Sequence, residues 1–548
     1  MSDAKETQKD LQSADRDGGN SQGAGPPTMS VAEMLAAARG EKADGQQSPK
    51  AAQSGPAESA ATPALPKPVA DRAAPAAAAG AQGTWRINLF ETVPLLKRIM
   101  KLRSFQFLVV LPNVLVFYLF FAVALFGNPM GNQNLMIMIV WILWWFVLIV
   151  FLVPFGSRVW CTVCPLPFFG DWIQRRELVR VRPGKTGALK NEFHGGTRPW
   201  PKKLRNIWMQ NIGFLAMALF SALLVTRPMA SLFVFALMVA AATIFAMIWR
   251  LRAFCNYLCP ISGFLSLYAM TATLELRHVD GDVCLKCKDK SCLTGSENGW
   301  ACPWGVYVGK LDRNNYCGLC MECVKSCPSD NISLFLRPFG TDIHLKHYDE
   351  AWKAFIMLVL AMVYSITLLG PYGWVKDLAN VTWTGNVVGF LLYSLCIILA
   401  CLVVLPIFHL IAISAGRALA WKEKLSRKKL FIGYAYTLVP LGLFAWIAFS
   451  FPLLLVNGSY ILQVVSDPFG WGWDLFGTAE VPWTPILPDI VPYIQTVIMM
   501  IGLLYAIVKG YEVARSLYQE RQSALWSFAP TTVYLCILTS VFLVFFTG

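Results

Sequence analysis

The chain has 548 residues, of which 56% are hydrophobic and 15% are charged, and its mean hydropathy is +0.49. An average soluble domain carries about 25% charged residues, so these values exclude a water-soluble globule and predict an integral membrane protein. The formal net charge is +14. The basic residues lie in loops between apolar segments and not on one soluble face, which favours membrane topology over nucleic-acid binding.

Residues 1–84 are rich in Ala, Gly, Pro, Ser and Gln and poor in large apolar residues. Such a composition cannot offset the entropy cost of ordering, so this segment is predicted to be disordered. Within it, Ser30 and Glu33 have the spacing of a helix capping box, which predicts a short helix over 30–39. This helix is either a docking peptide for a partner protein or a transient helix without a role.

Apolar segments long enough to cross a bilayer recur after residue 100. We predict a mainly α, polytopic membrane protein with about nine transmembrane helices. They lie near residues 104–126, 134–155, 207–226, 229–249, 352–374, 387–414, 431–456, 491–509 and 528–547. The predicted domains are a four-helix membrane region over 85–275, a cysteine-rich domain over 276–350 and a five-helix membrane region over 351–548.

Basic residues alternate with these predicted spans. The segment 97–103 and the loops 156–206 and 417–429 are strongly basic, whereas 457–490 contains no Lys or Arg. Positive charge stays on the cytoplasmic side of a membrane. We therefore expect a multi-pass protein of the cell inner (cytoplasmic) membrane, with the N-terminus and the cysteine-rich domain in the cytoplasm and the C-terminus outside.

The cysteine-rich domain contains two related runs of cysteines. The downstream run is C-x2-C-x2-C-x3-C-P, formed by Cys317, Cys320, Cys323 and Cys327. The upstream run is a stretched copy, C-x2-C-x4-C-x9-C-P, formed by Cys284, Cys287, Cys292 and Cys302. The downstream pattern is typical of bacterial ferredoxins that hold [4Fe–4S] clusters.

In a two-cluster ferredoxin the fourth cysteine of each run ligates the other cluster. This rule predicts two [4Fe–4S] clusters. One would be held by Cys302, Cys317, Cys320 and Cys323, and the other by Cys284, Cys287, Cys292 and Cys327. The alternative is a pair of structural zinc sites, although zinc sites usually pair two C-x2-C knuckles.

Two further cysteine pairs follow the second and fourth predicted spans. They are Arg158-Val-Trp-Cys161-Thr-Val-Cys164-Pro and Arg252-Ala-Phe-Cys255-Asn-Tyr-Leu-Cys259-Pro. Side by side, these Cys-Pro hairpins would bring four thiols together as a third metal centre or a redox-active thiol pair. The alternative is that each cysteine is a small buried residue at a helix end. The duplication favours the first interpretation.

With these motifs the chain resembles the NosR/NapH-type membrane polyferredoxins over about residues 100–340. That family joins transmembrane hairpins ending in Cys-Pro motifs to a cytoplasmic double [4Fe–4S] ferredoxin. Its members are implicated in moving electrons between quinol, cytoplasmic clusters and periplasmic reductases, or in supporting maturation of those enzymes. Cys255, Cys259 and Pro260 match the C-x3-C-P motif of the family, whereas Cys161 and Cys164 are one residue closer together.

Motifs and resemblance together predict an electron-transfer subunit and not a complete enzyme. Its expected partners are membrane lipid, other redox subunits or a soluble electron carrier, and quinone, for which His409 inside a predicted span is one candidate ligand. One alternative is a maturation factor for a metalloenzyme that works through the Cys-Pro thiols. Another is a membrane anchor subunit of a respiratory assembly.

Overall fold

The computed structural model describes residues 85–175, 198–368 and 373–547. The chain divides into two units, Met1–Leu65 and Pro66–Gly548, and every described residue belongs to the second. The disorder predicted for residues 1–84 and the helix predicted over 30–39 lie outside the described residues.

Eight helical segments in the described part are long and apolar enough to cross a membrane. They are α4 (Phe105–Phe126), α5 to α7 (Leu135–Gly156), α12 (Pro228–Ile248), α18 (Tyr348–Leu368), α21 to α22 (Val387–Leu419), α23 to α24 (Arg427–Ser466), η9 to α25 (Pro488–Leu517), and most of α26 (Arg521–Phe546). The protein is therefore mainly helical, with the segments of a multi-pass membrane protein.

The expectation of about nine uninterrupted spans is wrong at 207–226. This segment forms two helices, α10 (Trp208–Leu219) and α11 (Ser221–Thr226). Phe220 between them has φ −97° and ψ 13°, which leaves the α region and interrupts the helix. Each piece is shorter than the roughly 20 residues that one helix needs to cross the hydrocarbon core.

The two short helices nevertheless connect the two ends of α12. Gln210 near the start of α10 donates from Nε2 to the carbonyl oxygen of Cys255 at 3.1 Å, in the second Cys-Pro motif. A Cβ placed on Gly131, in the turn after α4, would lie 2.8 Å from the carbonyl oxygen of Thr226, so the end of α11 lies beside that turn.

The helix α24 (Leu438–Ser466) continues well beyond the predicted end at residue 456. Asn457 and its neighbours Gly458 and Ser459 predict a helix stop, because such residues favour caps and turns. The Asn457 side chain instead donates to the carbonyl oxygen of Leu453, 2.9 Å away and one turn earlier. With its donor satisfied within the helix, Asn457 does not end it.

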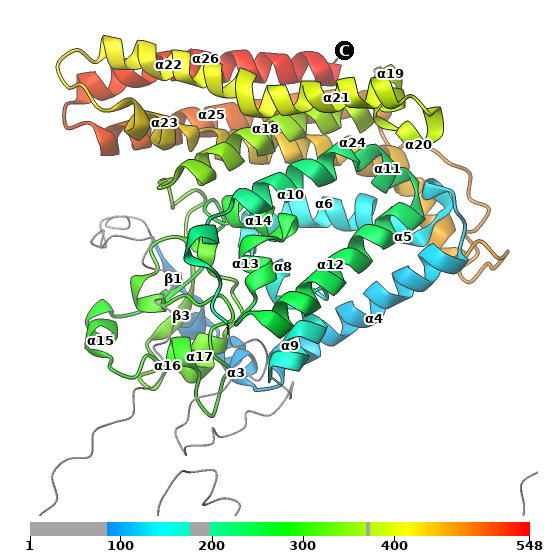
Figure 1. Ribbon diagram of the computed structural model, residues 1–548, viewed down its shortest axis with the longest axis horizontal. Coiled ribbons are helices and arrows are strands. Elements are labelled where there is room, and N and C mark those ends of the chain that lie inside the picture. The colour runs from blue at the N-terminus through cyan, green and yellow to red at the C-terminus, as the bar shows by residue number, and fades with distance from the viewer. Residues whose placement is uncertain (1–84, 176–197, 369–372, 548) are drawn as a thin grey trace, which may run out of the picture. The chain divides into compact units, whose positions relative to one another are not determined.

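One hydrophobic core runs through both helical regions. Trp446 of α24 lies at its centre, fully buried. Its ring packs against Trp145 of α6 (Trp145–Val147) and Phe264 of α14 (Pro260–Tyr268), at 5.6 Å between centroids in each case. Figure 1 shows the last helices together, with α22 and α26 side by side.

Two of the spans contain local irregularities. The segments η3 (Met138–Trp144), η4 (Leu148–Leu152) and η8 (Ala400–Val404) are wound as π-helices within longer helices. A π-turn inserts extra residues and turns the following side chains, and such turns often occur near functional sites. The first two lie on the segment that leads into the first Cys-Pro motif.

A small antiparallel sheet underlies the cysteine-rich part. Its strand order is β1 (Ile87–Asn88), β3 (Ile332–Leu336), β2 (Leu274–His278), with Leu336 opposite both Ile87 and Leu274. Leu276 and Leu334 are buried in its core. In Figure 1, β1 and β3 and the short helices α15 to α17 gather in one region of the molecule.

Short helices complete the described structure. They are α2 (Leu89–Thr92), α3 (Pro94–Lys101), η2 (Gly131–Gln133), α8 (Val159–Val163), α9 (Phe168–Arg175), η5 (Lys202–Leu204), α13 (Ala253–Tyr257), α15 (Gly281–Lys286), α16 (Ser291–Thr294), η6 (Val308–Lys310), η7 (Asn314–Tyr316), α17 (Glu322–Ser326), α19 (Gly373–Ala379) and α20 (Val381–Thr384). Five of the cysteines considered next lie in these short helices, and the others lie at helix caps or in the loops between them.

Candidate functional site

The thiols of Cys302, Cys317, Cys320 and Cys323 lie close together, and we call them the middle quartet. Burial raises the pKa of Cys302, and the neighbouring Cys320 and Cys317 raise it further. Burial also raises the pKa of Cys323 well above its ordinary value, with added effects from Cys320, Cys317 and Cys302. Because these thiolates would repel one another, they can ionise together only around strong positive charge such as a metal centre.

Cys284, Cys287, Cys292 and Cys327 form a second set, the distal quartet. Burial raises the pKa of Cys292 to about 12, and Cys327, Cys284 and Cys287 contribute. Asn331 donates from its backbone N to Cys327 Sγ and from Nδ2 to Cys284 Sγ, both at 3.4 Å. Each quartet thus contains three cysteines of one run and the fourth of the other, as crossed ligation requires.

The loop that carries Cys317, Cys320 and Cys323 has an unusual backbone. Leu319 and Met321 have φ values of 53° and 63°. Side chains other than glycine rarely adopt this left-handed conformation, and such strain persists where the surrounding structure enforces it. The Leu319 N–H lies 3.5 Å from Cys317 Sγ. Where left-handed residues alternate with others, several backbone N–H groups point to the same side of the chain. Such a group of donors can bind an anion, for example an iron–sulfur cluster.

Within residues 85–175, 198–368 and 373–547, no three His, Cys, Asp or Glu side chains converge as the ligands of one metal ion would. A [4Fe–4S] cluster is bound by four thiolates, and the middle and distal quartets each supply four thiols.

Cys161, Cys164, Cys255 and Cys259 form a third set, the Cys-Pro quartet. Burial raises the pKa of Cys255 well above its ordinary value, and Cys259, Cys164 and Cys161 contribute. Burial likewise raises the pKa of Cys259 to about 12. Cys161, Cys255 and Cys259 are each less than one-tenth exposed. The two hairpins therefore do bring four thiols together, in surroundings closed to solvent.

Two arginines bind the hairpins to each other. Arg158 of the first hairpin donates from Nη1 to the carbonyl oxygen of Ser262 at 3.0 Å and to its Oγ at 2.7 Å, next to Cys259 on α14. Arg252 of the second hairpin donates from Nη1 to the carbonyl oxygen of Cys161 at 2.9 Å. Both are buried. Sequence reasoning missed this role, although the arginine three residues before the first cysteine recurs in both copies.

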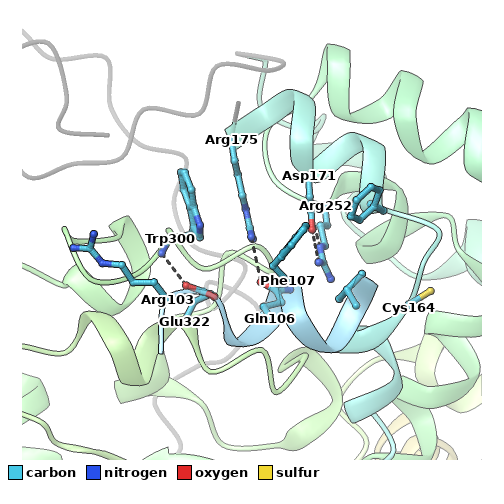
Figure 2. Close-up of a pocket in the computed structure, with 11 residues that line it drawn as sticks. Arg103, Gln106, Phe107, Cys164, Asp171, Arg175, Arg252, Trp300 and Glu322 are labelled. Carbon is cyan, nitrogen blue, oxygen red and sulfur yellow. Dashed lines mark hydrogen bonds and ion pairs between the residues drawn. The ribbon is translucent and has the colours of Figure 1, made fainter. Parts of the chain in front are cut away.

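Asp171 on α9 holds Arg252 in place. Its carboxylate oxygens lie 3.1 Å from Nε and 2.5 Å from Nη2 of Arg252. Burial would raise the pKa of Asp171, but Arg252 and Arg175 keep it below its usual value. Figure 2 shows the Asp171 and Arg252 side chains facing each other in a small pocket that Cys164 also lines. The charged side chains of Asp171 and Arg252 are therefore held in position next to the Cys-Pro quartet.

The first Cys-Pro hairpin contacts the loop that carries the middle quartet. Thr162 donates from Oγ1 to the carbonyl oxygen of Gly318 at 2.6 Å, and Arg158 donates from Nε to that of Cys317 at 3.4 Å. The Arg158 guanidinium also lies 4.3 Å from the centre of the buried Trp304 ring. The loop that carries the middle quartet is thus seated on the first Cys-Pro hairpin.

This seating depends on the absence of a side chain at Gly318. A Cβ there would lie 1.8 Å from Nε1 of Trp304, which is 1% exposed and has no room to move. Gly318→Ala is expected to destabilise the protein by about 1–3 kcal/mol and to disturb the middle quartet. Thermal unfolding and the EPR spectrum of the reduced protein measure both effects.

Gly373→Ala is the matched control, because no atom of the described residues lies within 4 Å of a Cβ at Gly373. Wild-type stability and an unaltered spectrum in the Gly318→Ala protein would contradict the packing described for Trp304.

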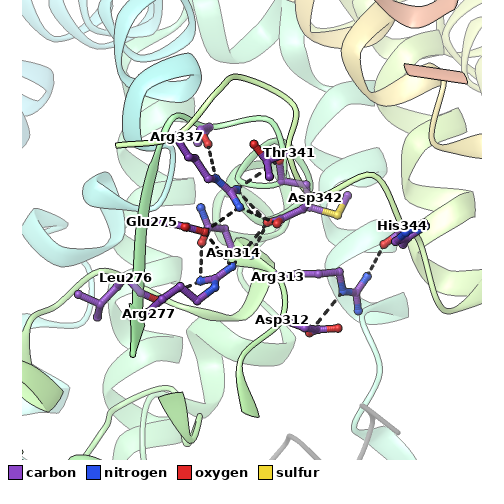
Figure 3. A network of polar contacts seen from close by, with 12 residues as sticks. Glu275, Leu276, Arg277, Asp312, Arg313, Asn314, Arg337, Thr341, Asp342 and His344 are labelled. Atoms are coloured by element: carbon purple, nitrogen blue, oxygen red, sulfur yellow. Dashed lines mark hydrogen bonds and ion pairs between the residues drawn. The ribbon is translucent and has the colours of Figure 1, made fainter. Parts of the chain in front are cut away.

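A buried ion network supports the other side of the middle quartet (Figure 3). Arg337 Nη1 lies 2.9 Å from Glu275 and 2.6 Å from Asp342. Asp342 in turn accepts from the backbone N of Asn314 at 2.8 Å, three residues before Cys317. Burial would raise the pKa of Asp342, but the Arg337 guanidinium keeps it below its usual value. The network fixes the start of the cysteine loop.

A family model described as a 4Fe-4S binding domain matches residues 137–186 and 231–271. These segments contain both Cys-Pro hairpins and end before the first cysteine of the cysteine-rich part. The chain is an iron–sulfur membrane protein. The family assignment thus falls on the cysteine pairs that sequence reasoning treated as secondary.

An uncharacterized protein of Methanocaldococcus jannaschii is 34% identical to the chain over 82 residues. The alignment covers 15% of this chain and 30% of that protein. No solved structure matches the chain.

Proposed function

We propose that this protein is an electron-transfer subunit of a larger oxidoreductase, in which the distal, middle and Cys-Pro quartets hold three [4Fe–4S] clusters in series. The first two would lie in a ferredoxin-like insertion, as in the NosR/NapH-type polyferredoxins. A [4Fe–4S] cluster accepts and releases one electron at a time. The protein residues position the clusters and set their electrostatic surroundings.

The seating of the middle-quartet loop on the first Cys-Pro hairpin is the observation that carries this proposal. The Arg252 guanidinium is also close enough to influence the pKa of both Cys255 of the Cys-Pro quartet and Cys320 of the middle quartet. Cys292 of the distal quartet contributes in the same way to the pKa of Cys323 of the middle quartet. These neighbours support an arrangement of the three thiol sets in one row, from the cysteine-rich part to the membrane helices.

Buried arginines give the row a further property. Arg158 Nη1 lies 3.7 Å from Cys161 Sγ, and Arg252 lies beside Cys255. Positive charge in surroundings of low dielectric stabilises added negative charge strongly. Both arginines would therefore raise the reduction potential at the Cys-Pro quartet and favour electron arrival there.

The ends of the row suggest the partners. Lys286, Lys288 and Lys290 are exposed beside the distal quartet and suit a soluble electron carrier or another redox subunit. The Cys-Pro quartet adjoins the membrane helices and suits quinone or a membrane partner. We further propose that the cysteine-rich part is cytoplasmic and that the membrane is the cell inner membrane, because basic loops flank the Cys-Pro hairpins.

A maturation factor that hands metal to another protein remains a second candidate, but the burial of its working thiols disfavours it. Cys161, Cys255 and Cys259 are 8%, 8% and 4% exposed. Cysteines that exchange ligands with a partner are partially exposed. The burial of these three thiols therefore favours a permanently bound cofactor over transfer of metal to a partner.

Metal analysis of anaerobically purified full-length protein tests the proposal. Three clusters predict about twelve iron atoms and as many sulfides per chain, with EPR signals that appear on chemical reduction. Reoxidation by an added acceptor should remove these signals. Colourless protein that contains zinc would overturn the proposal, as would clusters that neither accept nor release electrons.

A further inference from the structure

A cavity of about 180 Å³ lies among the membrane helices next to the Cys-Pro quartet. Its walls come from α4, η3, α6, α10, α12 and α14, and from the first Cys-Pro hairpin. Aromatic rings predominate in the lining, which includes Trp141, Trp144, Trp145, Trp160 and Phe235. Cys164 and Pro165 complete the wall at one end.

The size and lining of the cavity suit a planar ring. An apolar protein cavity of roughly 150 Å³ binds benzene, so this one has room for a single substituted ring. Aromatic side chains favour offset or edge-on contact with another ring, which selects a flat guest. The π-helical winding of η3 turns Ile139, Val140 and Trp141 into the lining.

One lining residue, Trp145, also carries an unpaired hydrogen-bond donor. Its Nε1 is buried and has no hydrogen-bond partner in the described part of the chain. By contrast, Trp141 Nε1 donates to Ser231 Oγ at 2.8 Å. A buried donor left unpaired costs free energy, so an occupant with an acceptor oxygen would be favoured over a hydrocarbon chain.

The cavity reaches the outer surface of the helices. Val116 on α4 lines it and is 48% exposed. The middle of α4 is apolar and belongs to a candidate membrane span, so this surface faces lipid. An occupant would therefore arrive from the bilayer, which requires a lipid-soluble molecule.

We propose that this cavity binds the ring of a quinone, with one carbonyl oxygen accepting from Trp145 Nε1 and the ring edge beside Cys164. A quinone combines the required features: it is planar, apolar, soluble in the bilayer and carries acceptor oxygens. The inference rests on the proposed electron-transfer function, in which a quinone is a membrane-side partner. It assigns that quinone to this cavity. His409, the candidate from the sequence, does not line this cavity: its side chain is fully buried and Nε2 lies 3.2 Å from the carbonyl oxygen of Phe431.

Binding of decylubiquinone to the full-length protein in lipid nanodiscs tests this site by titration. Val140→Phe fills the cavity and is expected to weaken binding at least tenfold. Trp145→Phe keeps a ring but removes the donor, and is expected to weaken binding about fivefold. Val388→Phe and Trp383→Phe are the matched controls, because both positions are strongly exposed and distant from the lining.

Photolabelling with an azido-quinone gives a second measurement that does not depend on the variants. Labelled peptides from residues 139–148 or 160–166 are expected. No saturable binding to the wild type, or equal binding by Trp145→Phe and Trp383→Phe with labelling elsewhere, would overturn the inference. Displacement of the quinone by added phospholipid alone would also overturn it and identify the occupant as a lipid chain.

Iron content measured on the same samples separates this inference from the proposed function. Quinone binding at the cavity of a protein without iron supports the site and overturns the electron-transfer proposal. Iron clusters in a protein that binds no quinone overturn the site alone.

Discussion

Anaerobically purified Cys259→Ser protein is expected to contain about four fewer iron atoms per chain than the wild type. Cys259 is 4% exposed, lies beside Cys161 and Cys164, and accepts from the backbone N of Ser262 at 3.4 Å. A serine oxygen cannot replace a soft thiolate as an iron ligand of comparable strength. Losing one of four ligands in a closed site leaves the cluster without support.

The middle and distal quartets should keep their clusters in this variant, because Cys259 belongs to neither set. Reduced samples would then show two sets of EPR signals where the wild type shows three. Cys536→Ser is the matched control, since Cys536 is exposed on α26 and should leave the iron content unchanged. Full iron content in Cys259→Ser would refute a cluster at the Cys-Pro quartet.

Replacing Arg337 by methionine is expected to destabilise the protein by about 3–5 kcal/mol. The Arg337 side chain is fully buried between Glu275 and Asp342 (Figure 3). Methionine retains much of its volume but removes the guanidinium that bridges the two carboxylates. Arg86 Nη2 remains 2.9 Å from Glu275, and Arg277 Nη2 remains 3.5 Å from Glu275 and 3.8 Å from Asp342. Asp342 loses its closest partner, and because poorly compensated charge in the interior costs several kcal/mol, a large fall in the midpoint of thermal unfolding should follow.

The pH dependence of the Arg337→Met protein identifies the cause. In the wild type, the pKa of Asp342 lies below its usual value. The stability from this pairing is therefore complete above about pH 4, the unfolded pKa, and is lost as pH falls through the lower folded pKa. Without Arg337, burial should raise the pKa of Asp342. Acidification then protonates this buried carboxylate, so the difference in free energy of unfolding between Arg337→Met and the wild type should become smaller.

Lys422→Met is a suitable control, because Lys422 pairs with Glu520 at an exposed site and should contribute nothing measurable. A difference between Arg337→Met and wild type that does not change between pH 7 and pH 4 would assign the effect to lost packing and not to charge.

The burial of acidic residues at the start of α18 was not visible in the sequence. The predicted span began at residue 352, but the helix begins at Tyr348 and includes Asp349 and Glu350, both buried. Glu350 accepts from Arg313 Nη1 at 3.0 Å, a residue 37 positions away in the chain. A hydropathy profile places the end of a span at such carboxylates. It cannot detect that a distant arginine pairs with Glu350 after folding, which makes its burial possible.

The positions of two spans followed closely from composition, whereas the predictions at 431–456, 491–509 and 528–547 cover parts of longer helical segments. Predicted helices at 104–126 and 229–249 correspond to α4 and α12 within about one residue. Bilayer thickness imposes a minimum length on any apolar helix, so local sequence is sufficient for these elements. The break at Phe220 has no comparable signal, because the residues around it are as apolar as the rest of the segment.

The amino-acid sequence by itself determined the kinds of ligand available and their local order, because cysteine spacing and apolar length are properties of neighbouring residues. Only the tertiary structure decided which thiols face one another, that Arg158 and Arg252 each reach into the other hairpin, and that nine aromatic side chains line a cavity beside Cys164. These features join residues far apart along the chain, and their energies arise from burial and charge pairing that exist once the helices have packed.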